Sequence, residues 1–376
     1  MRISHHLAAA ALAGAFVLSG CDATGPDVAD AAAADARATD SYIVVFEDGT
    51  PNARGLANRL ANGNPTHVYE NSIKGFAAHF SPQAAAALAR NPNVAYVEKD
   101  QLATLAPPSG KGPGGGGGGT SQVTPYGITR VNGGASGAGK VACVIDSGVD
   151  LDHPDLNVDA ARSRTFITSG KDSRDADDGN GHGTHVAGTI GAVDNSEGVV
   201  GVAAGATIIG VKVLDSRGSG SYSAVIAGVD YAATAGCSVA NMSLGGPVSQ
   251  ALDDAVLAAA SKGVVFALAA GNESDDARNH SPARAGIVSA NDNVYAISAV
   301  NSSDVFASFS NYGPAVAYAA PGVAIHSTWK GGGYNTISGT SMASPHAAGV
   351  FLLGAARTSG TAVGDPDGVA DPIIVH

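Results

Sequence analysis

Residues 140–148 read KVACVIDSG, in which five apolar residues are followed by Asp146, Ser147 and Gly148. An apolar run without polar alternation is typical of a strand buried on both faces, as in a parallel sheet. Similar runs alternate with helical patterns along the chain, with strands at 207–214, 239–242, 264–269 and 294–300 and helices at 183–192, 222–235 and 250–261. This order predicts an α/β fold, a doubly wound parallel sheet with helices on both faces. Active sites in such folds lie beyond the carboxyl ends of the strands, so Asp146 is a candidate site residue.

The composition limits the classes of protein to which the chain can belong. Of 376 residues, 44% are hydrophobic and 14% are charged, which is enough to build a sizeable core and excludes a disordered chain. The formal net charge of −12 argues against nucleic acid as a partner, because no basic surface would balance the phosphates. The 51 glycines have no collagen-like period and indicate tight turns and close approach of the main chain.

The first forty residues read as an export leader followed by a spacer. Met1-Arg2 and the apolar run 7–20 match the charged and apolar regions of a signal peptide, and the run is short for a membrane span. It ends in Leu18-Ser19-Gly20-Cys21, which resembles a bacterial lipobox, in which the signal is cut before a lipid-carrying cysteine. We therefore expect a lipoprotein-type signal at 1–20, lipidation at Cys21 and a spacer at 21–40. An ordinary cleaved signal is the alternative.

Residues 41–106 predict a small α+β domain ahead of the parallel sheet. Strand, helix, strand, strand, helix and strand patterns follow one another there, which is the order of a ferredoxin-like unit. Ser81-Pro82 has the signature of a helix start. Residues 107–119 then form a Pro/Gly linker that ends in six glycines, and residues 120–376 form the larger domain.

The two remaining cysteines lie at apolar strands of the larger domain. Cys143 is inside the strand quoted above, and Cys237 is at the entry to the strand at 239–242. We expect each to be a small buried core residue. The sequence leaves open whether a disulfide joins them, because no cysteine framework is present.

Three polar segments at expected strand or helix ends carry the elements of nucleophilic catalysis. Asp146 ends the first strand, His182 opens a helix in Gly181-His182-Gly183-Thr184-His185, and Ser341 opens a helix in Gly339-Thr340-Ser341-Met342-Ala343. A histidine removes the serine proton and returns it to the leaving group, while an aspartate orients the histidine and stabilises its cation. The order Asp, His, Ser along the chain is that of subtilisin, whereas α/β-hydrolases place the serine first.

Taken together, these segments resemble the subtilisin-like serine proteases, with the proteinase K branch close by. The resemblance extends from residue 41 to about 357. It implies that Asp146, His182 and Ser341 form a catalytic triad. It also implies that residues 41–106 are an inhibitor-I9-type propeptide, which assists folding, inhibits the enzyme and is then removed by self-cleavage.

The same resemblance implies an oxyanion donor and a substrate cleft. Ala269-Ala270-Gly271-Asn272 matches the oxyanion segment of the family, with Asn272 donating its amide beside the Ser341 backbone N–H. Two glycine-containing segments resemble the edges between which a peptide inserts as an extended strand, and their candidate residues are Gly218, Ser219, Gly220, Ser243, Leu244 and Gly245. Tyr222 resembles the aromatic lining the pocket for the fourth residue upstream of the cut. Recognition through the main chain predicts broad specificity.

A structural calcium site is a further implication of the resemblance. The segment Val-Asp-Asn-Ser-Glu-Gly-Val at 193–199 resembles the loop that holds the tight calcium in subtilisin. The implied oxygen ligands suit Ca²⁺ and come from Gln122, Asp155, Val193, Asn195, Glu197 and Val199. Gln122 is expected to reach its position only after the new N-terminus swings away. The acidic run Asp172, Asp175, Asp177 and Asp178 is a candidate second site, with a solvated loop as the alternative.

These features predict a secreted or lipid-anchored serine endopeptidase of broad specificity, made as a pre-pro form. Its expected partners are polypeptide substrates and its own propeptide, without nucleic acid, and with a membrane only through Cys21; we expect a monomer. The alternatives are a catalytically silent binding module of the same fold and a hydrolase of non-peptide esters. The processing site is open between about 104 and 121, because Pro107 is unfavourable after a scissile bond.

Overall fold

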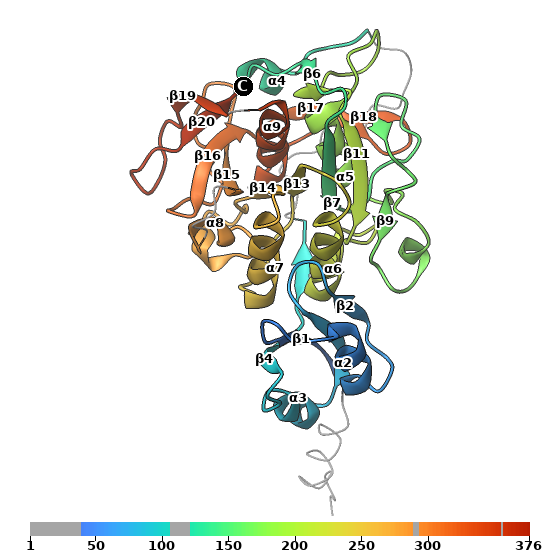
Figure 1. Cartoon of the computed structure of the whole chain (residues 1–376). Coiled ribbons are helices and arrows are strands. Elements are labelled where there is room, and N and C mark those ends of the chain that lie inside the picture. Colours follow the sequence, from blue (N-terminus) through green and yellow to red (C-terminus); the bar gives the residue numbers. More distant parts are fainter. Residues whose placement is uncertain (1–38, 106–120, 289–292, 355) are drawn as a thin grey trace, which may run out of the picture. The chain divides into compact units, whose positions relative to one another are not determined.

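The computed structural model describes residues 39–105, 121–288, 293–354 and 356–376 (Figure 1). The expected signal peptide, Cys21, nearly all of the spacer and all of the linker lie outside the described residues. Within the described residues, no helix is both long and apolar enough to cross a membrane.

The N-terminal domain is a four-stranded antiparallel sheet with two helices. Its elements are β1 Asp40–Phe46, α2 Ala53–Leu60, β2 His67–Tyr69, β3 Gly75–Phe80, α3 Pro82–Leu88 and β4 Val94–Lys99. The strand order β2-β3-β1-β4 is the expected ferredoxin-like arrangement. The Ser81 hydroxyl accepts from the Ala84 N–H, and Pro82 occupies the first turn, as predicted for this helix start. The core contains Val44, Phe46 and Phe76.

The larger domain contains most of the helices and strands. Its elements, with the strand β5 that precedes it, are β5 Leu102–Thr104, α4 Tyr126–Arg130, β6 Ala135–Ser136, β7 Val141–Asp146, β8 Asn157–Val158, β9 Arg164–Thr165, the 3₁₀ turn η1 Lys171–Ser173, α5 His182–Gly191, β10 Ala203–Ala204, β11 Thr207–Lys212, β12 Ser219–Ser221, α6 Tyr222–Ala232, β13 Val239–Met242, α7 Gln250–Ala260, β14 Val265–Ala269, the 3₁₀ turn η2 Ala277–Asn279, α8 Ala285–Val288, β15 Val294–Val300, β16 Val316–Pro321, β17 Ile325–Trp329, β18 Gly333–Ile337, α9 Thr340–Leu353, β19 Arg357–Thr361 and β20 Pro372–Val375.

The central sheet confirms the α/β prediction. Its order is β19-β20-β16-β15-β14-β13-β7-β11-β8, with β9 also on β11, and the strands from β8 to β20 run parallel. Alternate residues of β7 face opposite layers, because successive strand side chains point to opposite faces. Cys143 and Ile145 pack in the cluster that contains α6 and α7, whereas Ala142 and Val144 pack with α5 and α9. Figure 1 shows these two helix layers.

Two features of this domain differ from or extend the expectations. Cys143 and Cys237 form a disulfide, with Cα atoms 5.7 Å apart, so they are bonded core residues and not free ones. The chain after α9 adds the hairpin β19–β20, and β20 extends the parallel sheet beside β16, which no sequence pattern had indicated.

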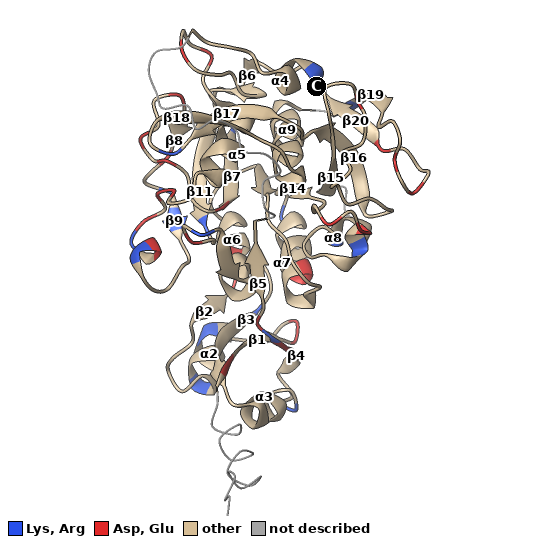
Figure 2. Ribbon diagram, turned by 180° about the vertical axis from the view of Figure 1, so that it is seen from behind, with Lys and Arg blue, Asp and Glu red and all other residues tan. Residues whose placement is uncertain are grey.

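Acidic residues are concentrated in loops and at helix ends (Figure 2). Several of these aspartates accept backbone N–H bonds within turns, including Asp178, Asp215 and Asp276. Aspartate is short enough to bond the main chain near its own position, which accounts for the 28 Asp against 5 Glu.

Candidate active site

The carboxyl end of β7 brings Asp146 to His182. The His182 Nδ1 lies 2.9 Å and 3.1 Å from the two Asp146 carboxylate oxygens, and both residues are buried. A carboxylate on Nδ1 fixes the tautomer in which that nitrogen carries the proton, so Nε2 is left as the acceptor. The Ser147 N–H also donates to Asp146 Oδ1 over 2.7 Å and holds the carboxylate in place.

The first turn of α5 is fixed by a buried aspartate that sequence reasoning had assigned to the candidate second calcium site. Asp178 accepts hydrogen bonds from the Gly181 and Thr184 N–H groups and from the hydroxyls of Ser147 and Thr184. Burial is the largest effect on its carboxyl and raises its pKa. Asp178 therefore positions the start of the helix that carries His182. Its place four residues before the histidine was the available sequence signal.

Main-chain contact between this helix and the β7 loop is close. A Cβ added to Gly183 would lie 2.0 Å from the Gly148 carbonyl oxygen, so only glycine fits without a shift. A second contact to the β7 loop comes from the neighbouring strand.

The buried Lys212 at the end of β11 donates to the Ser147 carbonyl over 2.5 Å. Sequence analysis did not single out Lys212, because a lysine at the end of an apolar strand carries no motif.

Ser341 lies at the same edge of the sheet, in the first turn of α9. Ile145 of β7 is in register with Met242 of β13, so Asp146 and Ser243 are the next residues of two adjacent strands. The Ser341 hydroxyl donates to the Ser243 carbonyl over 3.3 Å. The Ser243 hydroxyl in turn donates to the Ser341 carbonyl over 2.8 Å. These contacts bring the predicted acid, base and nucleophile to one edge.

Asn272 has a defined orientation beside Ser341. Its Oδ1 accepts from the Thr340 N–H over 2.8 Å and from the Thr340 hydroxyl over 2.9 Å. A backbone N–H can only donate, so the facing atom must be the oxygen, and the amide nitrogen points away. A Cβ added to Gly339 would lie 3.2 Å from Asn272 Nδ2 and 3.6 Å from the Ser341 nitrogen, so these two nitrogens lie close to each other. Thr340 is a positioning residue that sequence analysis missed.

The end of the N-terminal domain occupies the predicted substrate cleft. Strand β5 pairs antiparallel with β12, placing Ala103 opposite Gly220 and Thr104 opposite Ser219. On its other side, the Thr104 N–H donates to the Gly245 carbonyl over 3.0 Å. The Leu105 N–H donates to the Gly218 carbonyl over 2.9 Å. The two predicted edge segments thus bind an extended strand through main-chain hydrogen bonds.

Tyr222 lies under this strand. Its side chain is fully buried and belongs to the same apolar cluster as Ala103 and Leu244. The tyrosine hydroxyl donates to the Pro247 carbonyl over 2.7 Å, which fixes the ring. Tyr222 therefore lies beside the bound strand.

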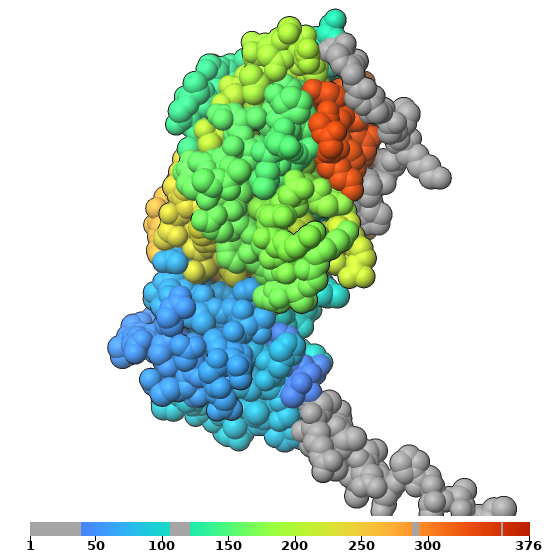
Figure 3. Space-filling model, turned by 90° about the vertical axis from the view of Figure 1, so that its right-hand side faces the viewer, coloured from blue at the N-terminus to red at the C-terminus, as the bar shows by residue number. Residues whose placement is uncertain are grey.

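Polar contacts also attach the rest of the N-terminal domain to α6 and α7. Figure 3 shows the N-terminal domain, in blue, lying directly against the larger domain. Asp230 of α6 accepts from the N–H groups of Glu70, Asn71 and Ser72. At the start of α7, Glu98 accepts from the Ala251 N–H over 3.1 Å. These bonds hold the domain against the two helices that flank the occupied cleft.

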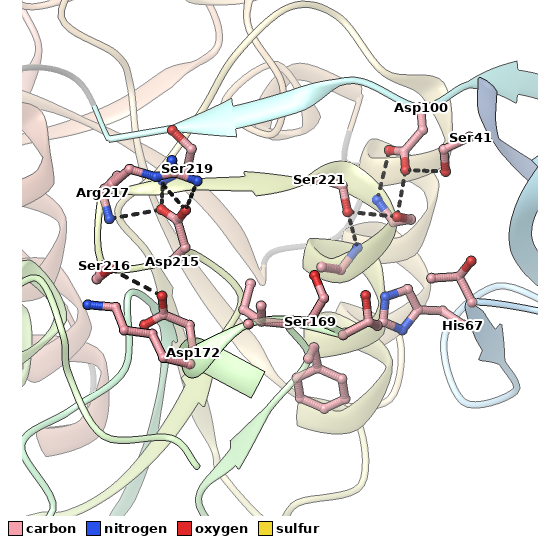
Figure 4. A pocket seen from close by; sticks show the side chains of 18 of the residues that line it. Ser41, His67, Asp100, Ser169, Asp172, Asp215, Ser216, Arg217, Ser219 and Ser221 are labelled. Carbon is pink, nitrogen blue, oxygen red and sulfur yellow. Dashed lines mark hydrogen bonds and ion pairs between the residues drawn. The ribbon is translucent and has the colours of Figure 1, made fainter. Parts of the chain in front are cut away.

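The cavity in Figure 4 lies beside this interface and does not include the candidate catalytic residues. Its volume is about 750 Å³, and residues of both domains line it, including His67 and Asp100 from one side and Asp215 from the other. Asp100 accepts from the hydroxyls of Ser41 and Ser223, so it joins the domains at the cavity rim. The cavity exists only while the N-terminal domain is attached.

The predicted calcium residues converge around Asp155. The Asn195 amide donates to Asp155 Oδ1 over 3.0 Å, and the Val199 N–H donates to Asp155 Oδ2 over 2.9 Å. The Val193 N–H donates to the Asp155 carbonyl over 3.0 Å, and the Glu197 N–H donates to Asn195 Oδ1 over 2.6 Å. Burial raises the pKa of the Asp155 carboxyl. The Asp155 and Asn195 side-chain oxygens accept N–H groups in these contacts, and oxygens of this kind are the ligands that suit a hard cation.

The expected movement of Gln122 is wrong for this chain. Gln122 Oε1 accepts from the Asn195 N–H over 2.6 Å, and its amide donates to Asp194 over 2.7 Å, while β5 still occupies the cleft. Residues 106–120 join the two segments, and fifteen residues can span up to about 50 Å. Because of this linker length, the uncut chain places both segments at once, and no swing of the new N-terminus is needed.

The second candidate calcium site is not supported. Asp178 is committed to the start of α5, and Asp172 forms an ion pair with Lys212 at 3.5 Å. Among residues 39–105, 121–288, 293–354 and 356–376, no group of three or more His, Cys, Asp or Glu side chains has a geometry that could hold a metal. The site around Asp155 depends on amide and main-chain oxygens, which such a group does not include.

A doubly wound sheet with a buried Asp–His pair and a serine at a helix start on the same edge is typical of serine hydrolases. Comparison with known families matches residues 137–360 to the subtilase family and residues 41–106 to the peptidase inhibitor I9 family. The chain belongs to the subtilase family of serine proteases and carries an inhibitor-I9-type propeptide.

Individual relatives agree with this assignment. The chain is 39% identical over 336 residues to the subtilisin-like serine protease AsES of Sarocladium strictum, covering 84% of this chain and 80% of that protein. It is 41% identical over 323 residues to subtilisin E of Bacillus subtilis strain 168, covering 83% and 79% respectively. The crystal structure of a cold adapted subtilisin-like serine proteinase superposes with a TM-score of 0.59 at 39% identity, covering 68% of this chain and 98% of that one.

Proposed function

We propose that this chain is an exported endopeptidase of broad specificity in which Asp146, His182 and Ser341 form the catalytic triad. The observation that carries the proposal is the buried His182–Asp146 contact of 2.9 Å at the sheet edge where Ser341 and Asn272 also lie. A strand already bound between Gly220 and Gly245 supports a polypeptide substrate.

The reaction follows from the directions of these groups. The Ser341 hydroxyl leaves the Ser243 carbonyl and donates to His182 Nε2 as its oxygen attacks the substrate carbonyl carbon. The oxyanion forms beside Asn272 Nδ2 and the Ser341 N–H, and both donors stabilise its charge. His182 then protonates the departing amine, and Asp146 stabilises the imidazolium. Water attacks the acyl-enzyme in a second cycle of the same proton transfers.

The propeptide inhibits by occupying the substrate cleft. Residues 102–105 form main-chain hydrogen bonds with both edge segments, as an extended substrate strand would. Removal of this strand opens the cleft, so processing is the activating step. Asp230 and Glu98 contribute affinity outside the cleft.

A structural calcium ion completes the proposal. The side-chain oxygens of Gln122, Asp155 and Asn195 would hold it, together with the carbonyl oxygens of Val193, Glu197 and Val199. Bound calcium would neutralise the buried Asp155 carboxylate and stabilise the fold through mass action. In the inactive Ser341→Ala precursor, EDTA should lower Tm and calcium should restore it, and Asp155→Asn should abolish the effect while Asp175→Asn preserves it. An unchanged melting curve after verified metal removal would exclude the site.

The proposal also includes export of the chain and its anchoring by lipid. The chain leaves the cytoplasm through the signal at 1–20, and Cys21 carries lipid that retains the enzyme at the cell envelope. Mass spectrometry of the first peptide of the exported protein tests this. A cut before Cys21 with an acyl-glyceryl mass increment supports anchoring, whereas a cut elsewhere or an unmodified Cys21 excludes it.

The function itself is tested with Ser341→Ala and Asn272→Leu. Ser341→Ala should accumulate as the uncut precursor and leave casein intact. Asn272→Leu should mature slowly and lose about 10²–10³ in kcat, a magnitude that was measured for the equivalent asparagine of subtilisin. Normal maturation and casein hydrolysis by pure Ser341→Ala would refute the triad. That result would also argue against the two alternatives, a silent binding module and a hydrolase that acts on esters alone.

A further inference from the structure

One buried asparagine holds the loop that carries Asn272. Asn311 lies between β15 and β16, and its side chain is fully buried. Its Oδ1 accepts from the Glu273 and Asp275 N–H groups, each over 3.0 Å. Its Nδ2 donates to the Ala270 carbonyl over 3.0 Å and to the Glu273 carboxylate over 2.7 Å. The side chain therefore spends both of its donors and both lone pairs of its oxygen on a single loop.

The main chain of the same residue adds a fifth hydrogen bond to this loop. The Asn311 N–H donates to the Gly271 carbonyl over 2.9 Å. Together these contacts flank Asn272, with residues 270 and 271 before it and residues 273 and 275 after it. A residue whose neighbours on both sides are bonded to one buried side chain has a fixed backbone position, so Asn311 determines where Asn272 stands.

The packing between Asn311 and the loop is close. Gly271 has a φ of +108°, a conformation that favours glycine. A Cβ at this position would lie 2.2 Å from Asn311 Nδ2 and 2.5 Å from Glu273 Oε2. The asparagine amide therefore fills the space beside Gly271, and the loop cannot shift towards Asn311 without a clash.

Asn272 is thus constrained at two levels. Thr340 orients the amide by donating to its oxygen, and Asn311 fixes the backbone from which this amide projects. An oxyanion donor acts over about 2.7–3.1 Å from the developing charge, so a small displacement of the backbone weakens it. Such a loss is felt in the transition state and not in substrate binding, because the oxyanion forms only during the reaction.

We propose that Asn311 is a positioning residue for the oxyanion donor, holding Asn272 in place through the loop at 270–275. The proposal rests on the proposed endopeptidase function and adds to it a fully buried residue that acts through another. Sequence analysis did not single out Asn311, because the groups that it bonds lie 36 to 41 residues earlier in the chain.

A double-mutant cycle tests whether Asn311 acts through Asn272. An added cysteine protease removes the propeptide from each variant and is then blocked with iodoacetamide, and kcat and KM are measured with a tetrapeptide p-nitroanilide. Asn311→Ala should lower kcat by about tenfold or more with KM within about twofold, because a misplaced catalytic group costs rate and not binding. In the Asn272→Leu background, the same substitution should lower kcat by less than about twofold, because the group that it positions is already absent.

Ser298→Ala is the matched control for the loss of a buried hydrogen bond. Ser298 is also fully buried, but its hydroxyl donates to Asp371, outside the loop at 270–275, so this variant should keep the wild-type kcat. An equal loss of kcat on adding Asn311→Ala to the wild type and to Asn272→Leu would overturn the proposal, as would a wild-type kcat in Asn311→Ala. A wild type that cleaves no peptide, or an Asn272→Leu variant with unchanged kcat, would instead overturn the proposed function on which the proposal rests.

A second pair of variants covers the case in which Asn311→Ala does not fold. Asn311→Asp keeps the shape and the two accepted bonds, but it turns an oxygen towards the Ala270 carbonyl and the Glu273 carboxylate. It should lower kcat by about tenfold or more. Adding Glu273→Gln supplies an amide that can donate to the new carboxylate, so kcat should recover by about threefold or more. The absence of any recovery would overturn the proposal.

Discussion

Loss of the Cys143–Cys237 disulfide should strongly destabilise the catalytic domain. The bond joins β7, which ends in Asp146, to the entry of β13, which leads to Ser243, across a sequence separation of 94 residues. Closing a loop of that length removes chain entropy from the unfolded state and corresponds to about 4.7 kcal/mol at 25 °C. For a domain of this size each kcal/mol shifts Tm by about 2–4 °C, so removal should lower Tm by about 10–20 °C.

The assay is thermal unfolding in the Ser341→Ala background, which prevents self-digestion. Cys143→Ala/Cys237→Ala is compared with the parent, and the parent refolded under reducing conditions controls for the two deleted sulfur atoms. The double variant and the reduced parent both lack the bond, so both should have a lower Tm than the oxidised parent. A double variant within about 2 °C of the parent would refute the entropic reasoning. Separate alkylation of peptides containing residues 143 and 237 in the denatured, unreduced chain would show that the bond is absent.

Two further predictions concern the propeptide and the active-site loop. Burial raises the pKa of Asp253 to about 7, and the negative charge of propeptide Glu98 adds to this effect. Release of the propeptide removes Glu98 and lowers the pKa of Asp253, so inhibition should be strongest at acidic pH and weaken as pH rises through about 7. The inhibition constant measured from pH 5 to 8 should depend less on pH in Glu98→Gln than in the control Glu70→Gln, and equal slopes would exclude the coupling. Gly183→Ala should lower kcat by about tenfold or more, because its Cβ would meet the Gly148 carbonyl oxygen at 2.0 Å and displace the Asp146–His182 pair. Gly191→Ala, on the same helix with its nearest atom at 3.3 Å, should retain most activity, and equal activity of the two variants would contradict this steric argument.

The sequence predicted the sheet, and it identified the candidate catalytic residues at the sheet edge, because their signals are local. An apolar run that ends in a polar residue indicates a buried strand and the residue at its carboxyl end. Asp146 was found in this way. His182 and Ser341 begin helices that follow glycine, and such starts are visible in a short window. The edge glycines were identified through their resemblance to the family's edge segments, since a glycine by itself is equally consistent with a turn.

The supporting residues could not be predicted in the same way, because their roles depend on contacts between distant segments. Thr340 acts through Asn272, which is 68 residues away in sequence, and Asp178 links the start of α5 to β7 through Ser147, which is 31 residues away. The disulfide was left open, because pairing depends on strand neighbours that one sequence does not specify. The expectation that Gln122 reaches the 193–199 loop only after cleavage was wrong, because Gln122 already contacts Asn195 and Asp194 in the uncut chain.

The central claim is that Ser341 is a nucleophile activated by His182. Mass spectrometry of the mature enzyme after treatment with a fluorophosphonate tests this most directly, because the reagent forms a stable adduct with an activated serine. The account predicts one adduct, on the peptide containing Ser341, and its loss in His182→Ala from which the propeptide has been removed by an added protease. An adduct on another residue, or equal labelling of Ser341 in His182→Ala, would contradict it.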